Sequence, residues 1–144
     1  MKTIAYGFGT TLEDVTFETA VGRVTDALKE QGFGVLTRID VKETLREKLD
    51  VDFRPYTILG ACNPKLANRA LSARPEVGLM LPCNVTVEAA EEGGVLVRIA
   101  DPGVMMGVGG FEDDAAIASV ASEARALLAK AAVSLSASPS PTEA

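Results

Sequence analysis

Histidine is absent from the 144 residues of this chain. Because histidine is the commonest general base and the commonest metal ligand, its absence excludes Ser-His and Cys-His catalytic triads. Cysteine is scarce as well, with only Cys62 and Cys83 present. Thiols stay reduced in the cytoplasm, so in a cytoplasmic chain two cysteines indicate a structural, reactive or metal-binding role before a disulfide.

An excess of positive charge is also missing. The sequence has 14 Lys and Arg against 20 Asp and Glu, which gives a net charge of -6. Nucleic-acid binding depends on the neutralisation of phosphates by Lys and Arg. The acidic balance therefore argues against nucleic acids, and equally against anionic membrane surfaces, as partners.

Long apolar runs are the third absence, since none approaches the roughly 20 residues needed to span a bilayer. The first residues lead directly into strand-like sequence, without the apolar segment and cleavage site of a signal peptide. We therefore expect a cytoplasmic protein. Length and composition are typical of one globular domain. We expect it to occupy residues 1–133, followed by a flexible Ser- and Pro-rich tail over residues 134–144.

Hydrophobic periodicity predicts alternating strands and helices. Strands are expected over residues 3–10, 34–39, 56–62, 77–87 and 95–99, and helices over residues 17–30, 41–49, 64–73 and 117–128. Pro82 lies inside the fourth strand and cannot donate to a ladder, so an edge or a bulge is expected there. Residues 105–110 are expected to form a loop rich in Gly and Met. This order predicts an α+β two-layer sandwich, with helices on one face of a mostly antiparallel sheet.

Two short blocks, Cys62-Asn63-Pro64 and Pro82-Cys83-Asn84, stand out from this pattern. With them, the chain resembles the family called domain of unknown function 302 from about Met1 to Leu128. Further blocks of the resemblance are Gly32 to Leu36, Ile39 to Val41, Lys48-Leu49, Pro55-Tyr56, Ile58 to Ala61 and Asp101-Pro102. The resemblance implies a fold like that of the TATA-binding protein, β-α-β(4)-α with a curved antiparallel sheet, and a homodimer. It implies no activity, and the acidic balance argues against DNA binding by this chain.

Cys62 is the thiol with the stronger physical reason for reactivity. It precedes Asn63-Pro64, which has the N-cap and first-turn residues of a helix. The positive end of the helix dipole favours negative charge and hence a thiolate. The alternative interpretation is a buried structural cysteine, with Asn63 serving only as the cap.

Cys83 and Asn84 lie beside the irregularity that Pro82 imposes. A bulge there could re-aim the Cys83 side chain, and the Asn84 amide could bind a substrate carbonyl or neighbouring backbone. Alternatively, Cys83 belongs to the apolar face of its strand and is a core residue.

Asp40 and Lys48 form a second candidate pair, at the end of a strand and on the following short helix. They could act as an acid/base pair. The alternative is that Asp40 caps the helix, in a capping box with Glu43, and that Lys48 is a solvated helix charge.

Asp101 with Met105 and Met106 could in principle join the thiols around a soft ion such as copper(I). The spacing matches no defined metal site, and a loop that packs at a dimer interface is the preferred interpretation. No metal site is therefore expected. The glycines at 107–110 lack the Lys-Ser/Thr of a phosphate-binding loop.

These observations predict a small domain that binds a small molecule at Cys62, Asn63, Cys83 and Asn84, with Asp40 and Lys48 as further polar contacts. The alternative is a thiol-based redox or sulfur-handling protein that uses Cys62 with Cys83. That alternative requires Cα atoms less than about 7 Å apart. A purely structural interaction module is the third possibility. The sequence identifies no cofactor and no reaction.

Overall fold

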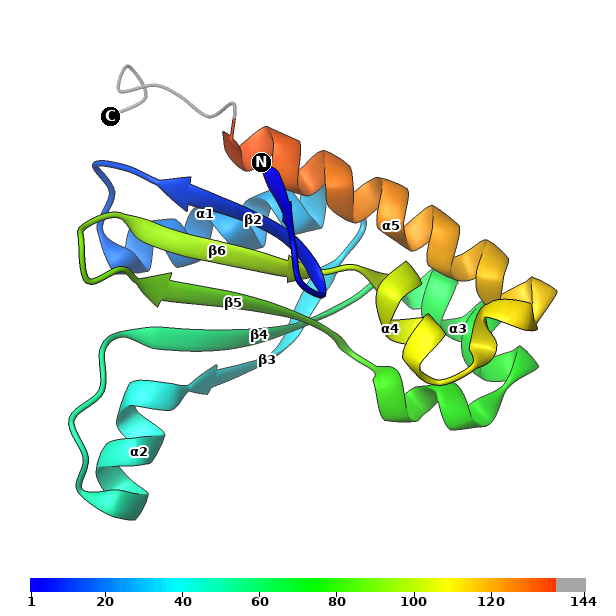
Figure 1. Cartoon of the computed structure of the whole chain (residues 1–144), viewed down its shortest axis with the longest axis horizontal. Coiled ribbons are helices and arrows are strands. Elements are labelled where there is room, and N and C mark those ends of the chain that lie inside the picture. Colours follow the sequence, from blue (N-terminus) through cyan, green and yellow to red (C-terminus); the bar gives the residue numbers. More distant parts are fainter. Residues whose placement is uncertain (137–144) are drawn as a thin grey trace.

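A six-stranded sheet with helices on one face forms the body of the protein (Figure 1). The structure, a computed structural model, describes residues 1–136. The strand order is β1-β2-β6-β5-β4-β3, and every neighbouring pair is antiparallel. This arrangement confirms the predicted α+β sandwich.

The elements follow the expected alternation of strands and helices. Their bounds are β1 (Lys2–Ile4), β2 (Gly7–Leu12), α1 (Phe17–Glu30), β3 (Gly34–Asp40), α2 (Val41–Leu49), β4 (Tyr56–Cys62), α3 (Pro64–Ala73), the 3-10 helix η1 (Pro75–Met80), β5 (Cys83–Ala89), β6 (Val95–Ala100), α4 (Pro102–Val108), the 3-10 turn η2 (Phe111–Asp113) and α5 (Ala115–Ser136).

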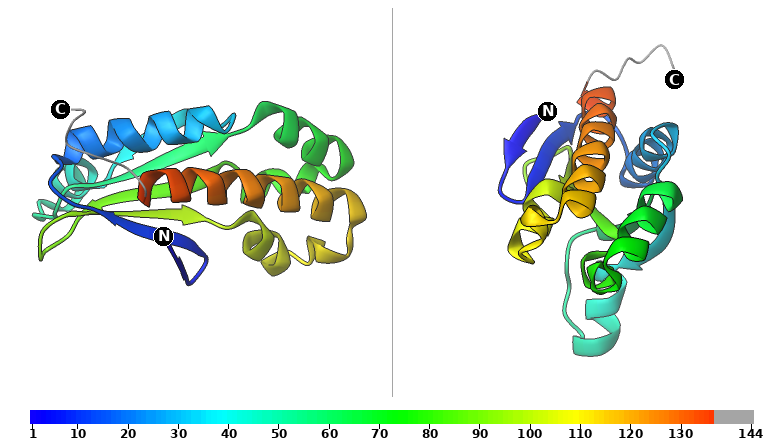
Figure 2. Two further views of the ribbon diagram at one scale, coloured as in Figure 1. Left: turned by 90° about the horizontal axis from the view of Figure 1, so that it is seen from above. Right: turned by 90° about the vertical axis from the view of Figure 1, so that its right-hand side faces the viewer.

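The main core lies between the sheet and the two long helices, which run alongside each other in both views of Figure 2. Alternate residues of the four central strands point into it, among them Phe8, Leu59 and Val85, each with at most 2% of its surface exposed. Leu28 of α1 and Leu128 of α5 meet them with no exposed surface. The other residues of each strand therefore point to the opposite face, which we call the open face.

Residues 3–10 do not form one strand, as the sequence predicted, but two strands joined by a tight turn. Tyr6 occupies the turn with a φ of 69°, a conformation unusual for a residue with a side chain. The backbone oxygen of Tyr6 accepts a hydrogen bond from the Asp101 N–H at 2.8 Å, which ties the turn to the end of β6. This long-range bond has no signature in the local sequence.

The predicted strand over residues 77–87 is also wrong in its first half. Residues 75–80 form η1, and β5 begins at Cys83 after a cis Leu81–Pro82 peptide. Val77 is fully buried in a second core cluster with residues of α3, α4 and α5, while Leu79 is 89% exposed. Packing of η1 against these helices overrides the alternating pattern. The expected irregularity at Pro82 is the point where the chain enters the sheet.

Two expectations near the carboxyl end are corrected. Residues 102–108 form α4 rather than a loop, because Asp101 caps the helix by accepting from the Gly103 N–H at 2.9 Å. Helix α5 extends to Ser136, past the predicted domain boundary at residue 133, and Leu135 is 3% exposed in the core. The rest of the predicted tail, residues 137–144, lies outside the described residues.

Candidate functional site

The predicted site residues separate into two groups at opposite ends of β4. Cys62 and Asn63 end this strand, and Cys83 and Asn84 begin β5 beside it, where Cys83 pairs with Ala61. Asp40 pairs with Thr57, near the start of β4. The structure thus brings the two Cys-Asn steps together and leaves Asp40 and Lys48 elsewhere.

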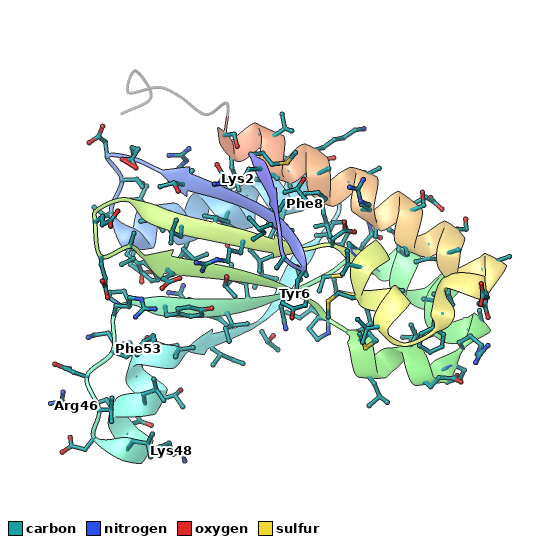
Figure 3. The ribbon with its side chains drawn as sticks, in the orientation of Figure 1. Lys2, Tyr6, Phe8, Arg46, Lys48 and Phe53 are labelled. Carbon is teal, nitrogen blue, oxygen red and sulfur yellow. The ribbon has the colours of Figure 1, made fainter. Side chains whose placement is uncertain are left out.

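Asn63 and Asp40 both serve as helix N-caps. The Asn63 side-chain oxygen accepts from the Leu66 N–H at 3.2 Å, and the Asp40 carboxylate accepts from the Glu43 N–H at 2.9 Å. Lys48 is exposed at the far end of α2, which extends away from the sheet (Figure 3). Capping and solvation therefore account for Asn63, Asp40 and Lys48.

The two thiols are free, partly buried, and line the same small apolar cavity of about 40 Å³ between β4, β5 and helices α3 to α5. Cys83 packs against the main core, as the alternative interpretation expected. Burial, and to a smaller extent the nearby Cys62 thiol, together raise the pKa of the Cys83 thiol to about 11. Cys83 therefore stays protonated at neutral pH.

A larger hollow, missed by sequence reasoning, lies on the open face at the Pro82-Cys83-Asn84 end of β5. We call it the open-face groove. It measures about 570 Å³ and runs between the β1–β2 turn, the strands β5 and β6, the η1 segment and α4. Figure 3 shows Tyr6 at this turn, in front of the sheet. Its polar lining comes from Tyr6, Tyr56, Asn84, Thr86 and Arg98, and apolar side chains such as Ile4, Leu81, Pro82 and Met105 supply most of the rest.

Strand alternation places the polar residues of the open-face groove. Val85 and Val87 of β5 are buried in the main core, so Asn84, Thr86 and Glu88 point to the open face. Arg98 of β6 lies directly opposite Thr86 in the antiparallel ladder. The alternation of polar and apolar residues over 84–88 was the available signal, but the sequence did not show that a second strand places Arg98 beside it.

Glu88 anchors two arginines on the open face. Its side chain is 7% exposed, and its two carboxylate oxygens accept hydrogen bonds from Arg54 Nε and from one Nη of Arg98, each at 2.5 Å. Burial opposes ionisation of the Glu88 carboxyl. The hydrogen bonds and charges of Arg98 and Arg54 outweigh that effect and lower its pKa below the ordinary value. Glu88 is therefore an anion at neutral pH that fixes both guanidinium groups.

The side-chain hydroxyl of Thr86 is in an unusual environment. Its hydroxyl oxygen is buried and has no hydrogen-bond partner among the described residues. It is a residue of the open-face groove, opposite Arg98. Because buried polar groups in native structures nearly always have a partner, the hydroxyl can receive one from outside the chain.

Within residues 1–136, no three His, Cys, Asp or Glu side chains are grouped in a way that could hold a metal ion. No helix in this part of the chain is long and apolar enough to cross a membrane.

Comparison with known proteins places the chain in a family. The family described as domain of unknown function DUF302 matches residues 8–135. A solved structure, the crystal structure of an uncharacterized conserved DUF302 protein from Bacillus stearothermophilus, is similar with a TM-score of 0.79 and 29% sequence identity, over 90% of this chain and 98% of that chain. A search of curated proteins found no match. These matches confirm the resemblance carried by the two Cys-Asn blocks, and the chain belongs to the DUF302 family.

Proposed function

We propose that the protein binds a small molecule in the open-face groove, at the Pro82-Cys83-Asn84 end of β5. The observation that carries this proposal is the buried, unpartnered hydroxyl of Thr86. Leaving such a group without a hydrogen bond costs about 1–3 kcal/mol. A bound ligand that accepts from or donates to this hydroxyl removes that cost.

The form of the open-face groove supports the same proposal. Its volume of about 570 Å³ lies within the range of small-molecule sites. Such sites are mostly apolar with a few polar groups that fix the orientation of the ligand. Here the walls are largely apolar, and Asn84, Thr86 and Arg98 supply the polar groups.

The proposal keeps part of the site predicted from the sequence. Cys83 and Asn84 belong to the open-face groove, while Cys62 and Asn63 line the small cavity beside it. Asp40 and Lys48 do not line the open-face groove and are not part of the proposed site.

Thr86→Val tests the proposal, because it removes the hydroxyl and keeps the shape of the side chain. We expect the ligand-free variant to be as stable as the wild type, or more stable, since no hydrogen bond is lost. Native mass spectrometry of the purified proteins should show a co-purified small molecule on the wild type and less of it on the variant. Thr25→Val is the matched control, because Thr25 bonds to the Val21 carbonyl within α1, away from the open-face groove. Equal occupancy of Thr86→Val and wild type would contradict the proposal.

A thiol-based redox or sulfur-handling function, with Cys62 and Cys83, is the second candidate. It is favoured by the presence of both thiols at one cavity and by the adjacency of Cys62 to the Ala61–Cys83 pair. The raised pKa of Cys83 weighs against it, because the thiolate is the reactive form. The first candidate is preferred for this reason.

We also propose that the protein is a homodimer, as the family resemblance implies, and that β3 and α2 form the interface. Among the described strands, β3 pairs only with β4, so the other edge of β3 has no neighbouring strand. Helix α2 has no buried residue. The exposed apolar residues of this region are Leu36, Ile39, Leu49 and Val51, which we call the β3–α2 surface. A second copy, whose β3 edge and apolar residues are the same, can cover it about a two-fold axis.

A further inference from the structure

Among residues 1–136, Arg98 is the one charged residue that lines the open-face groove. Its side chain is 43% exposed, although Glu88 fixes one end of the guanidinium. A guanidinium has five N–H donors. Among the described residues, the Arg98 guanidinium uses one of these donors, in its bond to Glu88. The remaining donors are available to a ligand.

The charges around Arg98 leave one positive charge in excess. Glu88 carries one negative charge and contacts two arginines, Arg54 and Arg98. Arg54 lies outside the open-face groove and stacks on the Phe53 ring, 4.5 Å from its centroid. The groove therefore presents a single cation, in a protein whose net charge is -6.

We propose that the ligand of the open-face groove is a monocarboxylate with an apolar body. The inference rests on the small-molecule binding proposed above and names its chemical class. Arg98 donates to the carboxylate, since the planar fork of a guanidinium matches that group. Thr86, directly across the ladder, donates its unpartnered hydroxyl to the same carboxylate. The apolar body lies against side chains such as Leu81, Pro82 and Met105.

The same charge balance disfavours other ligand classes. A cationic ligand would meet Arg98 without a free carboxylate to pair with, because Glu88 is already bonded through both oxygens. A phosphate monoester carries nearly two charges at neutral pH. Within the described part of the chain, the lining of the groove has one arginine and no lysine to balance them.

Isothermal titration calorimetry with four eight-carbon probes tests the inference. The probes are octanoate, 1-octanol, octylammonium and octyl phosphate, which share the apolar body and differ in the head group. We expect octanoate to bind at least about tenfold more tightly than octanol, because charge-assisted hydrogen bonds are roughly twice as strong as neutral ones. Octylammonium should bind more weakly than octanol, and octyl phosphate more weakly than octanoate.

Two arginine variants make the test specific. Arg98→Met should reduce octanoate affinity about tenfold or more and leave octanol affinity unchanged. Arg54→Met is the matched control, because it removes the same charge and the other Glu88 bond but no group of the open-face groove. Its octanoate affinity should fall clearly less than that of Arg98→Met, because Arg54→Met lowers the local positive charge but leaves the guanidinium donors of the groove in place. If Arg98→Met does not fold by circular dichroism, Arg98→Lys replaces it, and loss of the guanidinium fork should still weaken octanoate several-fold.

Octanoate that binds no tighter than octanol, or that is unaffected by the Arg98 variants, would overturn the inference. So would stronger binding of octyl phosphate or of octylammonium, and so would binding of none of the four probes. The Thr86→Val occupancy measurement judges the proposed function separately, because it uses the co-purified molecule and none of these probes.

Discussion

Cys83 shows how the position of a single residue sets its chemistry. The residue stands at the start of β5, packed against the main core, and burial raises the pKa of its thiol to about 11. The neutral thiol is therefore the form that the fold selects at physiological pH. A resolving cysteine in a redox pair must react readily, so this position favours packing over thiol chemistry.

The raised pKa predicts slow alkylation of Cys83. A thiol with an ordinary pKa of 9.0 that is shifted to about 11 has a thiolate fraction about 100-fold lower at pH 8. In a Cys62→Ser variant, burial, the main cause of the shift, remains while the contribution of Cys62 is removed, so the iodoacetamide reaction at Cys83 should be slower than in an unfolded peptide at that pH by up to about 100-fold. The rate should rise about tenfold for each pH unit up to about pH 11. Mass spectrometry of the modified protein measures it.

A Cys83→Ser variant gives the complementary rate for Cys62. Alkylation of Cys83 at the peptide rate below pH 9, or a Cys62–Cys83 disulfide in the native wild type, would favour the redox candidate over the proposed binding function. Such a disulfide is detected as a mass loss of two hydrogens and by its reversal with a reductant.

At the scale of the element, Gly60 allows Pro82 to pack across β4. A Cβ atom at Gly60 would lie 2.2 Å from Thr37 Oγ1 and 2.7 Å from Pro82 Cγ. Thr37 can rotate its side chain, but the proline ring cannot move without the backbone of the segment that leads into β5. Gly60 therefore supports the wall of the open-face groove that Pro82 forms.

Gly60→Ala should destabilise the protein by about 1–3 kcal/mol, the usual cost of overpacking a well-packed position. Urea denaturation followed by circular dichroism measures this free energy of unfolding. Gly34→Ala is the matched control on the neighbouring strand, where an added Cβ meets nothing within 4 Å. The control should be unchanged or slightly more stable, since alanine restricts the unfolded chain. A Gly60→Ala variant as stable as Gly34→Ala would contradict the described packing of Pro82.

Elements with local signals could be predicted from the sequence. The boundary between β4 and α3 was predicted correctly, because Asn63-Pro64 carries its own cap and first-turn chemistry. The turn at Tyr6 and the η1 helix were not predicted. A backbone hydrogen bond to Asp101 holds the turn, and burial of Val77 among three helices stabilises η1. Both contacts join residues that are distant in the sequence.

The candidate site also combines features that the sequence indicated with features that it did not. The sequence singled out both Cys-Asn steps but did not predict that they meet, which they do because β4 and β5 are neighbours. Sheet register sets the pairing of Thr86 with Arg98. The positions of Tyr6 and Met105 in the lining of the open-face groove depend on how the β1–β2 turn and α4 are placed against the sheet. No short motif encodes those features, so the sequence indicated the end of the sheet but not the groove.

At the scale of the whole molecule, α2 is a helix that the single chain buries only in part. It extends from the sheet in Figure 1 and in the right-hand view of Figure 2. None of its residues is buried, and Leu49 at its end is 65% exposed. Most helices in globular proteins are stabilised chiefly by the packing of an apolar face. A nine-residue helix with no fully buried residue is marginal by itself, which favours a partner over the β3–α2 surface.

Val51→Glu should convert the proposed dimer into a monomer. The substitution places a charge in the middle of an apolar contact, where burial without a partner is costly. Sedimentation-velocity ultracentrifugation should give a dimer for the wild type and a monomer of about 15.0 kDa for the variant. Val133→Glu is the matched control, because Val133 is 51% exposed on α5, comparable to the 44% of Val51, but lies outside the β3–α2 surface. The control should remain a dimer.

A monomeric wild type would refute the dimer, and a dimer that persists in Val51→Glu would place the interface elsewhere. Because no residue of the β3–α2 surface lines the open-face groove, the Val51→Glu monomer should retain its ligand, and this separates assembly from binding.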